Sequence, residues 1–552
     1  MSGIDYSEFY RINDKGKVSV SIPKLMDYLQ TFGFGQFCDS PQATKNGSQI
    51  KIDYKNKRIY PSNEIYAQTF IKNDIVGKLD EDEDAIYQIR DATDLVTRLD
   101  KRLENIQPYS EDGEEEGFDP AQYKQINIHR DTKDRCSIPF QNGVVVITKD
   151  DITLKKTDAI DGYIWSSAIV QNNIKLEEAD EYQEGMFYRF VNNAFKNIKS
   201  VTEFDHIDRI PVLEDQKKGM QSAFGFLIHD YNDPSQARVV TLVDAEADNN
   251  KKALGRTGKS LMIEALKHIG RHTCKIEGAK WTAHASDASR FRWQSVSSDH
   301  RIVFIDEVNP EFDMRLMFSS VTSDMEVERK KKDPIIIPLA RKPKFALTTN
   351  YITAGTGESH AKRMHIVETQ NFWNRVVRTR EKGGLGAEAI DLLDGRLMFQ
   401  EWKKNDPEWQ HFFNYMFYCV QQHLKNDCRL QASTKSTYDY KLLVKSIEGS
   451  DGTGEFVDWW EEWLETNMGE QVFIDEILQS FINEFPEKET IEGGQWDRKR
   501  FKEAVEEYCS AKNLEFNASE KYKGDSWTKR RIRAKDKNGK TQECMIITSA
   551  LV

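Results

Sequence analysis

A glycine-rich loop followed by a lysine and a hydroxyl residue is the first feature of this sequence that could do chemistry. Gly255–Ser260, GRTGKS, lies between an apolar run at 239–243 and the amphipathic stretch SLMIEALKHIG. Glycines let successive backbone N–H groups turn inward around phosphates, and a following helix N-terminus adds its positive end. Lys259 would reach the β- and γ-phosphates, and the Ser260 hydroxyl would ligate Mg²⁺. The residues predicted to bind a nucleotide are Gly255, Arg256, Thr257, Gly258, Lys259, Ser260 and Leu261.

The loop departs from the usual phosphate-binding pattern at one position. Ala253 stands where the first glycine is expected, five positions before Gly258, so Gly255 is the candidate for flexibility at the entry of the loop. A Gly-Lys-Ser triplet alone is a weak signal in a chain this long, and its context has to decide. Here the context is strand, glycine loop and helix, which is the order that the motif requires.

Two neighbouring carboxylates at the end of a second apolar run supply the missing specificity. Arg301–Glu307 reads RIVFIDE, and Asp306 lies 47 positions after Lys259. In such a site Asp306 would hold the Mg²⁺ shell, and Glu307 would orient and deprotonate the attacking water. The plainer interpretation is an edge strand capped by acids. The upstream loop favours the catalytic interpretation.

An amide follows a third apolar run. Lys344–Thr349 is followed by Asn350, 44 positions after Asp306. At the carboxyl tip of a strand beside the acids, this side chain would sense the γ-phosphate and hold the water, whereas alone it would most often be a turn residue. We therefore predict a catalytic set with ATP and Mg²⁺ as the bound groups and with Ser260 and Asp306 on the metal. This set comprises Lys259, Asp306, Glu307 and Asn350.

Four segments, GRTGKS, VFIDE, FALTTN and SHAKRMHIVE, resemble motifs A, B and C and the arginine-finger segment of superfamily 3 helicases. The likeness is greatest to the phage, plasmid and poxvirus-type primase-helicases, which are AAA+ P-loop ATPases. It covers about residues 135–375, including IPFQNGVVVI at 138–147, and keeps Lys259 to Arg363 within 105 residues. The resemblance implies hexameric rings around single-stranded DNA, with ATP hydrolysed between subunits.

The resemblance also gives roles to two groups of basic residues. Arg363, with Lys362 beside it, would act as a catalytic finger in the site of the neighbouring subunit; the plainer interpretation is an exposed pair at a strand edge. A basic hairpin between motifs B and C lines the channel of such rings, and this chain has SDMEVERKKKDPIIIP there. A charge run is usually only a solvated face. Its place here predicts contacts with the DNA backbone by Arg329, Lys330, Lys331 and Lys332.

The end of the chain has the element order of a winged helix. Helical signals at 473–485 and 496–513 precede strand-like runs at 528–533 and 543–548, and Asn538-Gly539 is a hairpin turn signal between these runs. Helix, helix and hairpin follow one another as a winged helix requires.

Positive charge concentrates in this hairpin. From 521 to 540 nine residues are basic and two are acidic. The net charge of this segment is therefore positive, whereas that of the whole chain is negative. A wing that contacts duplex phosphates is the functional interpretation, and a winged helix that binds protein is the alternative. The predicted DNA contacts in this part are Lys529, Arg530, Arg531 and Arg533.

These segments require an α/β core with accessory parts on both sides. Strand and helix signals alternate from 238 to about 371, which predicts a mostly parallel sheet. The fold class we predict is an α/β P-loop (AAA+-like) ATPase core with a mixed α+β N-terminal region, a helical segment after the core and a C-terminal winged-helix-like domain. The predicted boundaries are 1–120 for an N-terminal accessory domain, 121–215 for a helical and β collar-like region, 216–375 for the superfamily 3 ATPase core, 376–450 for the helical segment and 455–552 for the winged-helix-like domain.

Two helical patterns and two linkers complete the organisation. Ile86–Ile106 has apolar residues near helical spacing. The runs at 109–117 and 448–455 are rich in acidic, Gly and Ser residues and are candidate linkers. A further stripe at helical spacing is interpreted as core and nothing more: Trp409, Phe412, Phe413, Met416, Phe417, Val420 and Leu424.

The composition excludes several classes of protein. The chain has 552 residues, of which 38% are hydrophobic and 30% charged, and its net charge is −12. No run reaches the roughly 20 apolar residues that span a bilayer, and MSGIDYSEFY lacks the pattern of a secretory signal. Seven scattered cysteines without a CxxC pair predict neither a disulfide framework nor a zinc site. We expect a cytoplasmic protein of a bacterial cell or infected host, with no membrane partner.

Together these features predict an ATP hydrolase that works as a ring-forming DNA helicase or translocase in the replication of a phage or mobile genetic element. Its expected partners are single-stranded or forked DNA and further copies of itself in a homo-hexamer. The compact acidic segment Asp205–Asp208 suits a cap or surface pair better than primase chemistry, so a separate primase or polymerase is expected. Two alternatives stay open, a packaging-type DNA motor and a nucleotide-gated, origin-binding initiator or scaffold.

Overall fold

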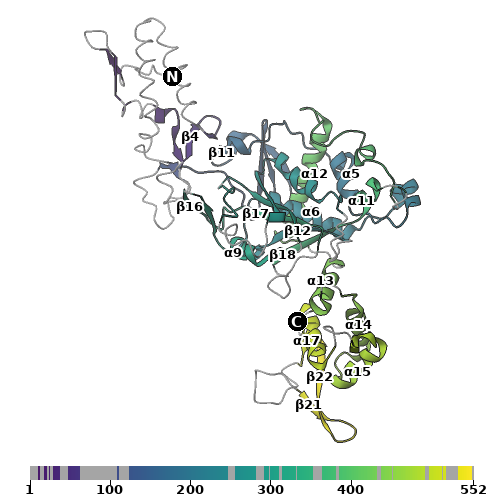
Figure 1. Ribbon diagram of the computed structural model, residues 1–552. Coiled ribbons are helices and arrows are strands. Elements are labelled where there is room, and N and C mark those ends of the chain that lie inside the picture. The colour runs from purple at the N-terminus through teal and green to yellow at the C-terminus, as the bar shows by residue number, and fades with distance from the viewer. Residues whose placement is uncertain are drawn as a thin grey trace.

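The fold is described from a computed structural model of the chain (Figure 1). The predicted helix at 86–106 lies outside the described residues. Within the part of the chain that is described, no helix combines the length and apolar character needed to cross a membrane. The structure describes residues 10–12, 18–21, 24, 29–37, 48–61, 109–110, 124–178, 180–245, 255–280, 291–297, 299–309, 312, 314–330, 332–351, 363–378, 380, 384–431, 437–449, 452–490, 496–512, 514–517 and 532–549.

A five-stranded sheet, in which every strand runs parallel to its neighbours, forms the centre of the molecule. Its order in space is β13-β14-β17-β12-β18. The strands are β12 (Val239–Asp244), β13 (Thr273–Glu277), β14 (Ile302–Val308), β17 (Lys344–Thr349) and β18 (Met364–Thr369). The prediction of a parallel sheet between 238 and 371 is therefore confirmed.

Both faces of this sheet are covered, which is why its inner strands read as continuous apolar runs. On β12, Val240 and Leu242 pack into the larger apolar core, whereas Val239 packs into a second core on the other face. The predicted stripe from Trp409 to Leu424 lies in the larger core, so its role as core is confirmed. The helices that fill the larger core are α5 (Met186–Asn193), α6 (Glu214–Ile228), α11 (Phe372–Val377) and α12 (Pro407–Lys425).

Smaller sheets precede the central sheet, of which the three-stranded one is antiparallel and the six-stranded one is mixed. A three-stranded sheet has the order β10-β9-β8, and the tight connection between β8 and β9 falls at Gln141 and Asn142. A six-stranded sheet has the order β11-β5-β4-β3-β6-β7, and β1 pairs with β2. The bounds are β1 Tyr10–Ile12, β2 Val18–Val20, β3 Phe34–Phe37, β4 Ser48–Asp53, β5 Arg58–Pro61, β6 Tyr109–Ser110, β7 Lys124–Gln125, β8 Cys136–Phe140, β9 Gly143–Ile147, β10 Ile152–Lys155 and β11 Ile164–Trp165.

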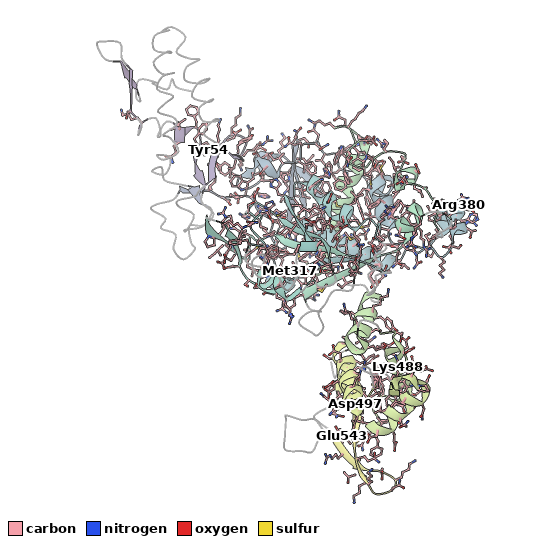
Figure 2. The ribbon with its side chains drawn as sticks, viewed as in Figure 1. Tyr54, Met317, Arg380, Lys488, Asp497 and Glu543 are labelled. Carbon is pink, nitrogen blue, oxygen red and sulfur yellow. The ribbon has the colours of Figure 1, made fainter. Side chains whose placement is uncertain are left out.

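The C-terminal part forms a separate lobe below the central sheet in the view of Figure 1. Its strands have the order β19-β22-β20, and β21 pairs with the outer part of β22 across a turn at Gly539. Lys488, Asp497 and Glu543 all lie in this lobe (Figure 2). The elements are α13 (Thr437–Glu448), α14 (Glu455–Asn467), β19 (Gln471–Phe473), α15 (Ile474–Glu484), α16 (Glu487–Thr490), α17 (Arg498–Ala511), β20 (Leu514–Phe516), β21 (Ile532–Lys535) and β22 (Thr541–Ser549).

The apolar core of this lobe begins upstream of the boundary expected at 455. Leu443, Val444 and Ile447 of α13 are buried in the same cluster as Phe456, Trp460 and other residues of the lobe. The reason is that α13 presents one apolar face to the helices that follow it. Gly/Ser/Asp composition at 448–455 therefore marks a bend between packed helices of one core.

A pair of glycines on α6 offers a test of the helix packing. A Cβ on Gly225 would overlap the Cys419 carbonyl oxygen and lie 2.6 Å from the His423 Cβ, whereas one on Gly219 would meet only the Gln431 carbonyl oxygen, at 3.5 Å. We expect Gly225→Ala to destabilise the core by about 1–3 kcal/mol. Gly219→Ala should be neutral or stabilising by up to about 1 kcal/mol, because alanine favours helix. Thermal unfolding measures both, and equal melting temperatures for the two variants would contradict this packing.

Candidate nucleotide site

Three neighbouring strand ends bring the predicted residues together. The glycine loop follows β12 and leads into α7 (Lys259–Glu264), the acids end β14, and Asn350 follows β17. Because β17 lies between β14 and β12 and all three are parallel, their carboxyl ends meet at one edge of the sheet. The amide of Asn350 is thereby placed between the loop and the acids.

Lys259 is the centre of the first group of contacts. Its Nζ donates hydrogen bonds to Asn350 Oδ1 at 2.7 Å and to Thr257 Oγ1 at 3.0 Å, and it pairs with the Asp244 carboxylate. The residue is only 6% exposed. The structure thus joins a loop residue to a strand-tip amide 91 positions away.

Asp244, the last residue of β12, is a site residue that the sequence reasoning missed. Its Oδ1 accepts hydrogen bonds from Lys259, Thr257 and Thr369, the last at 3.3 Å. Burial lowers the pKa of Lys259, and the carboxylate of Asp244 opposes that shift. The one sequence pattern that could have identified Asp244 is an acidic residue at the end of a buried strand, before a glycine loop.

Asp306 is the centre of the second group. Its Oδ1 accepts hydrogen bonds from Ser260 Oγ at 2.7 Å and Thr348 Oγ1 at 2.6 Å, and its Oδ2 lies 2.8 Å from Lys275 Nζ. Burial alone would raise the pKa of Asp306, but the hydrogen bonds from Lys275, Ser260 and Thr348 lower it below its usual value. The carboxylate is therefore ionised beside a hydroxyl, which is the hard oxygen pair that Mg²⁺ prefers.

Glu307 faces a different environment from its neighbour, at a point where the strand is irregular. The register between β14 and β17 shifts between Ile305 and Val308, and Glu307 has a φ of 55°. Its backbone N–H donates to Thr348 Oγ1 at 3.0 Å, while its side chain is exposed. A left-handed backbone costs a non-glycine residue of order 1 kcal/mol or more. Of these two successive acids, Asp306 is buried and Glu307 is exposed.

The loop is held in place by the helices around it. Gly258 has a φ of 88°, and a Cβ there would lie 2.5 Å from Cζ of Phe190, whose ring stacks on Trp373. Asn374 Nδ2 donates to the Gly255 carbonyl oxygen at 2.8 Å. Of the other predicted loop residues, Arg256 is exposed and Leu261 packs against the larger core.

Arg363 lies away from these groups. It immediately precedes β18, whose first residue, Met364, pairs with Val239 at the amino end of β12. Its guanidinium carbon lies 4.6 Å from the centre of the Phe318 ring. A strand of six residues separates the two edges of a sheet by roughly 20 Å, so Arg363 does not reach the site of its own chain. Lys362 lies outside the described residues.

The predicted DNA-contact residues divide between two hairpins. β15 (Met325–Arg329) and β16 (Lys332–Ile337) are antiparallel, so Arg329, Lys330 and Lys332 lie near the tip of a hairpin, where Lys330 is exposed. Arg533 is exposed on β21, opposite Glu543 of β22. The described residues do not include Lys331, Lys529, Arg530 or Arg531.

Comparisons with known proteins add little to this geometry. No protein-family model matches the sequence, and no curated protein matches it. One similar solved structure is "The apo structure of NrS-1 C terminal region (305-718)", at 12% identity, with 95% of this chain and 98% of that chain covered and a TM-score of 0.36. Another, the A form apo structure of the same region, has 13% identity, covers 95% and 99%, and has a TM-score of 0.39. At these identities and TM-scores, the two similarities establish neither the fold nor the function of this chain.

The buried pair of Asp244 and Lys259 can be tested by its coupling. Asp244→Asn should lower the stability of the core by about 3–5 kcal/mol, because it leaves a buried cation uncompensated. The double variant with Lys259→Met should lose less than the sum of the single changes, since neither charge is then left alone. Thermal unfolding measures the cycle. Glu503→Gln, which breaks an exposed pair with Lys499, is the control and should leave the melting temperature unchanged. Stability losses that simply add in the double variant would refute the coupling between Asp244 and Lys259.

Proposed function

We propose that this protein is a Mg²⁺-dependent ATP hydrolase with an α/β P-loop, AAA+-like core. The observation that carries the proposal is the direct hydrogen bonding of Lys259 to Asn350 and of Ser260 to Asp306 at one edge of a parallel sheet. Ligands of open α/β sheets bind at this carboxyl edge. Four residues separated by up to 91 positions meet there, in the combination that phosphate, metal and water require.

The division of labour follows from the contacts. Ser260 and the ionised Asp306 would hold Mg²⁺, which neutralises phosphate charge. Lys259 would bind the β- and γ-phosphates, in competition with Asp244 for the same ammonium group. Exposed Glu307 would take the proton of the attacking water, and Asn350 would orient that water beside the γ-phosphate.

The position of Arg363 supports action between subunits. It lies at the amino edge of the sheet, whereas Lys259 lies at the carboxyl edge. In a ring the amino edge of one chain can face the carboxyl edge of the next, so this arginine would stabilise charge in the neighbouring site. We therefore propose a homo-hexamer whose sites are completed by the adjacent chain.

The basic hairpin supports the proposal that the energy of ATP hydrolysis drives movement on a nucleic acid. Lys330 is exposed at the tip of β15 and β16, in a chain whose net charge is −12. Local positive charge on an acidic protein suits salt-dependent contact with a phosphate backbone. Our proposal is a DNA helicase or translocase in phage or mobile-element replication, with Arg533 as a further DNA contact and a separate primase or polymerase as partner.

Substitutions at the site should separate binding from chemistry. Lys259→Ala should abolish ATP hydrolysis and strand separation together, because the phosphates lose their cation. Glu307→Gln should keep ATP binding while hydrolysis falls by about 10²–10⁴-fold, because only the base is removed. Steady-state ATPase, nucleotide-binding and unwinding assays measure these effects. Lys267→Ala, an exposed lysine in the next turn, is the matched control. Strand separation that survives Lys259→Ala would overturn the site.

The hairpin is tested by the salt dependence of DNA binding. Lys330→Ala should weaken binding to single-stranded DNA and lower the slope of log K against log salt by roughly 0.7 for each phosphate that the hairpin no longer neutralises. Lys155→Ala, an exposed lysine on β10, should leave the slope unchanged. Fluorescence anisotropy at several salt concentrations gives both slopes. Identical slopes for the two variants would remove the hairpin from the DNA interface.

A further inference from the structure

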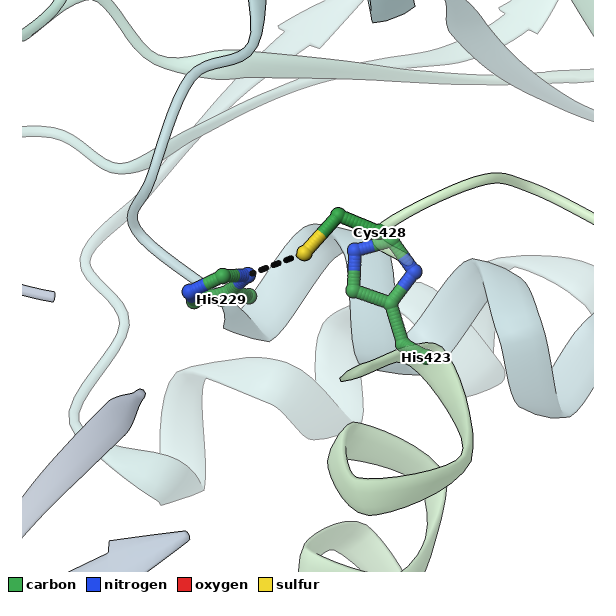
Figure 3. Close-up of side chains that lie close together, drawn as sticks. All are labelled: His229, His423 and Cys428. Carbon is green, nitrogen blue, oxygen red and sulfur yellow. Dashed lines mark hydrogen bonds between the residues drawn. The ribbon is translucent and has the colours of Figure 1, made fainter. Parts of the chain in front are cut away.

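Two histidines and a cysteine meet in the interior, away from the nucleotide site. His229 follows α6, His423 lies in the last turn of α12, and Cys428 lies in the turn after α12. Figure 3 shows the three side chains converging, with the Cys428 Sγ 3.8 Å from the His229 Nδ1. One ligand atom from each of the three lies within 4.8 Å of the other two. All three residues are at most 4% exposed.

Hydrogen bonding prepares the histidines to act as ligands. His229 Nε2 is 2.8 Å from the Thr132 carbonyl oxygen, which can only accept, so Nε2 carries the proton and Nδ1 presents a lone pair toward Cys428. A backbone carbonyl that orients a histidine in this way is usual at metal sites. Within the described residues the buried Nδ1 of His423 has no hydrogen-bond partner. A half-turn of that ring exchanges each nitrogen with a ring carbon, so its orientation is fixed only by the groups that the nitrogens bind.

Burial lowers the pKa of His229 and brings that of His423 well below its usual value. Burial raises the pKa of Cys428, and nearby Lys344 opposes that shift. Lys344 itself, which donates to the His229 carbonyl oxygen at 2.6 Å, has its pKa lowered to about 8 by burial.

We propose that His229, His423 and Cys428 bind one divalent metal ion of the zinc class. The ion would form bonds to two neutral imidazole nitrogens and to the Cys428 sulfur, whose proton leaves to solvent. In a tetrahedral zinc site, bond lengths of 2.0–2.3 Å place ligand atoms roughly 3.3–3.6 Å apart, so the sulfur and Nδ1 need to approach by only a few tenths of an ångström. The three protein ligands leave a fourth position for an outside donor.

The role of this ion is structural. It would tie the end of α6 to the end of α12, two helices that pack along each other in the larger core. Lys344, the first residue of β17, contacts the cluster, which places it at the amino edge of the sheet, opposite the nucleotide site. The ligands lie up to 199 positions apart in sequence. The sequence predicted no zinc site because it lacks a CxxC pair. That pattern detects only ligands that are close in sequence, so it could not have detected this cluster.

The experiment uses the full chain and the metals themselves. The purified protein is stripped with a chelator, reloaded with Zn²⁺ or Co²⁺, washed, and its metal content is measured by mass spectrometry. We expect one ion per chain, a rise in melting temperature with Zn²⁺, and visible d–d bands with a thiolate charge-transfer band for Co²⁺. His423→Gln and Cys428→Ser should reduce bound metal to background. Cys419→Ser, which removes another buried thiol from α12, should retain it.

Two outcomes would overturn the proposal. One is a folded wild-type chain that holds neither ion after reloading, and the other is metal binding that Cys428→Ser leaves unchanged. If the variants do not fold, the wild-type cobalt spectrum decides alone, because a spectrum without the thiolate band excludes Cys428 as a ligand. Since none of these measurements involves ATP, failure of this site and failure of the proposed function are distinguishable.

Discussion

The buried carboxylate of Asp306 is the interaction on which the candidate site depends. Moving an ionised carboxylate from water into a protein costs several kcal/mol unless hydrogen bonds and opposite charge replace the lost solvent. Ser260, Thr348 and Lys275 supply that replacement from α7, β17 and β13. One carboxylate thereby fixes the loop helix, its own strand and both neighbouring strands relative to one another. The group that we propose to hold Mg²⁺ therefore also fixes the frame of the candidate site.

The second buried charge, Lys259, depends on the same frame. Its partners Asp244 and Asn350 follow from the order of the strands, which sets β17 next to β12. The loop that carries Lys259 packs against aromatic side chains, because Gly258 lies close to the ring of Phe190. The large aromatic core between the sheet and α12 is thus connected to the glycine loop, and we expect volume changes in that core to be transmitted to the candidate site.

The two edges of the sheet carry different groups. The carboxyl edge holds the polar contacts suited to phosphate, metal and water, while the amino edge holds Arg363 and the cluster of His229, His423 and Cys428. This separation follows from parallel strands, because every strand end of one kind lies on one side. It leaves Arg363 outside the site of its own chain, and it keeps the proposed metal remote from nucleotide chemistry.

The sequence by itself determined the local features: the loop around Lys259, the paired acids, the strand-tip Asn350, the parallel sheet and the core stripe of α12. These could be predicted because each is a short pattern with a fixed period or spacing. Asp244, Thr348 and Lys275 could not, because single common polar residues acquire meaning only from their neighbours in space. The cluster of His229, His423 and Cys428 could not be predicted for the same reason, since its members lie far apart in sequence. Strand order, the register shift near Glu307 and the placement of Arg363 away from the candidate site of its own chain were decided by tertiary packing, which joins segments that no local pattern relates.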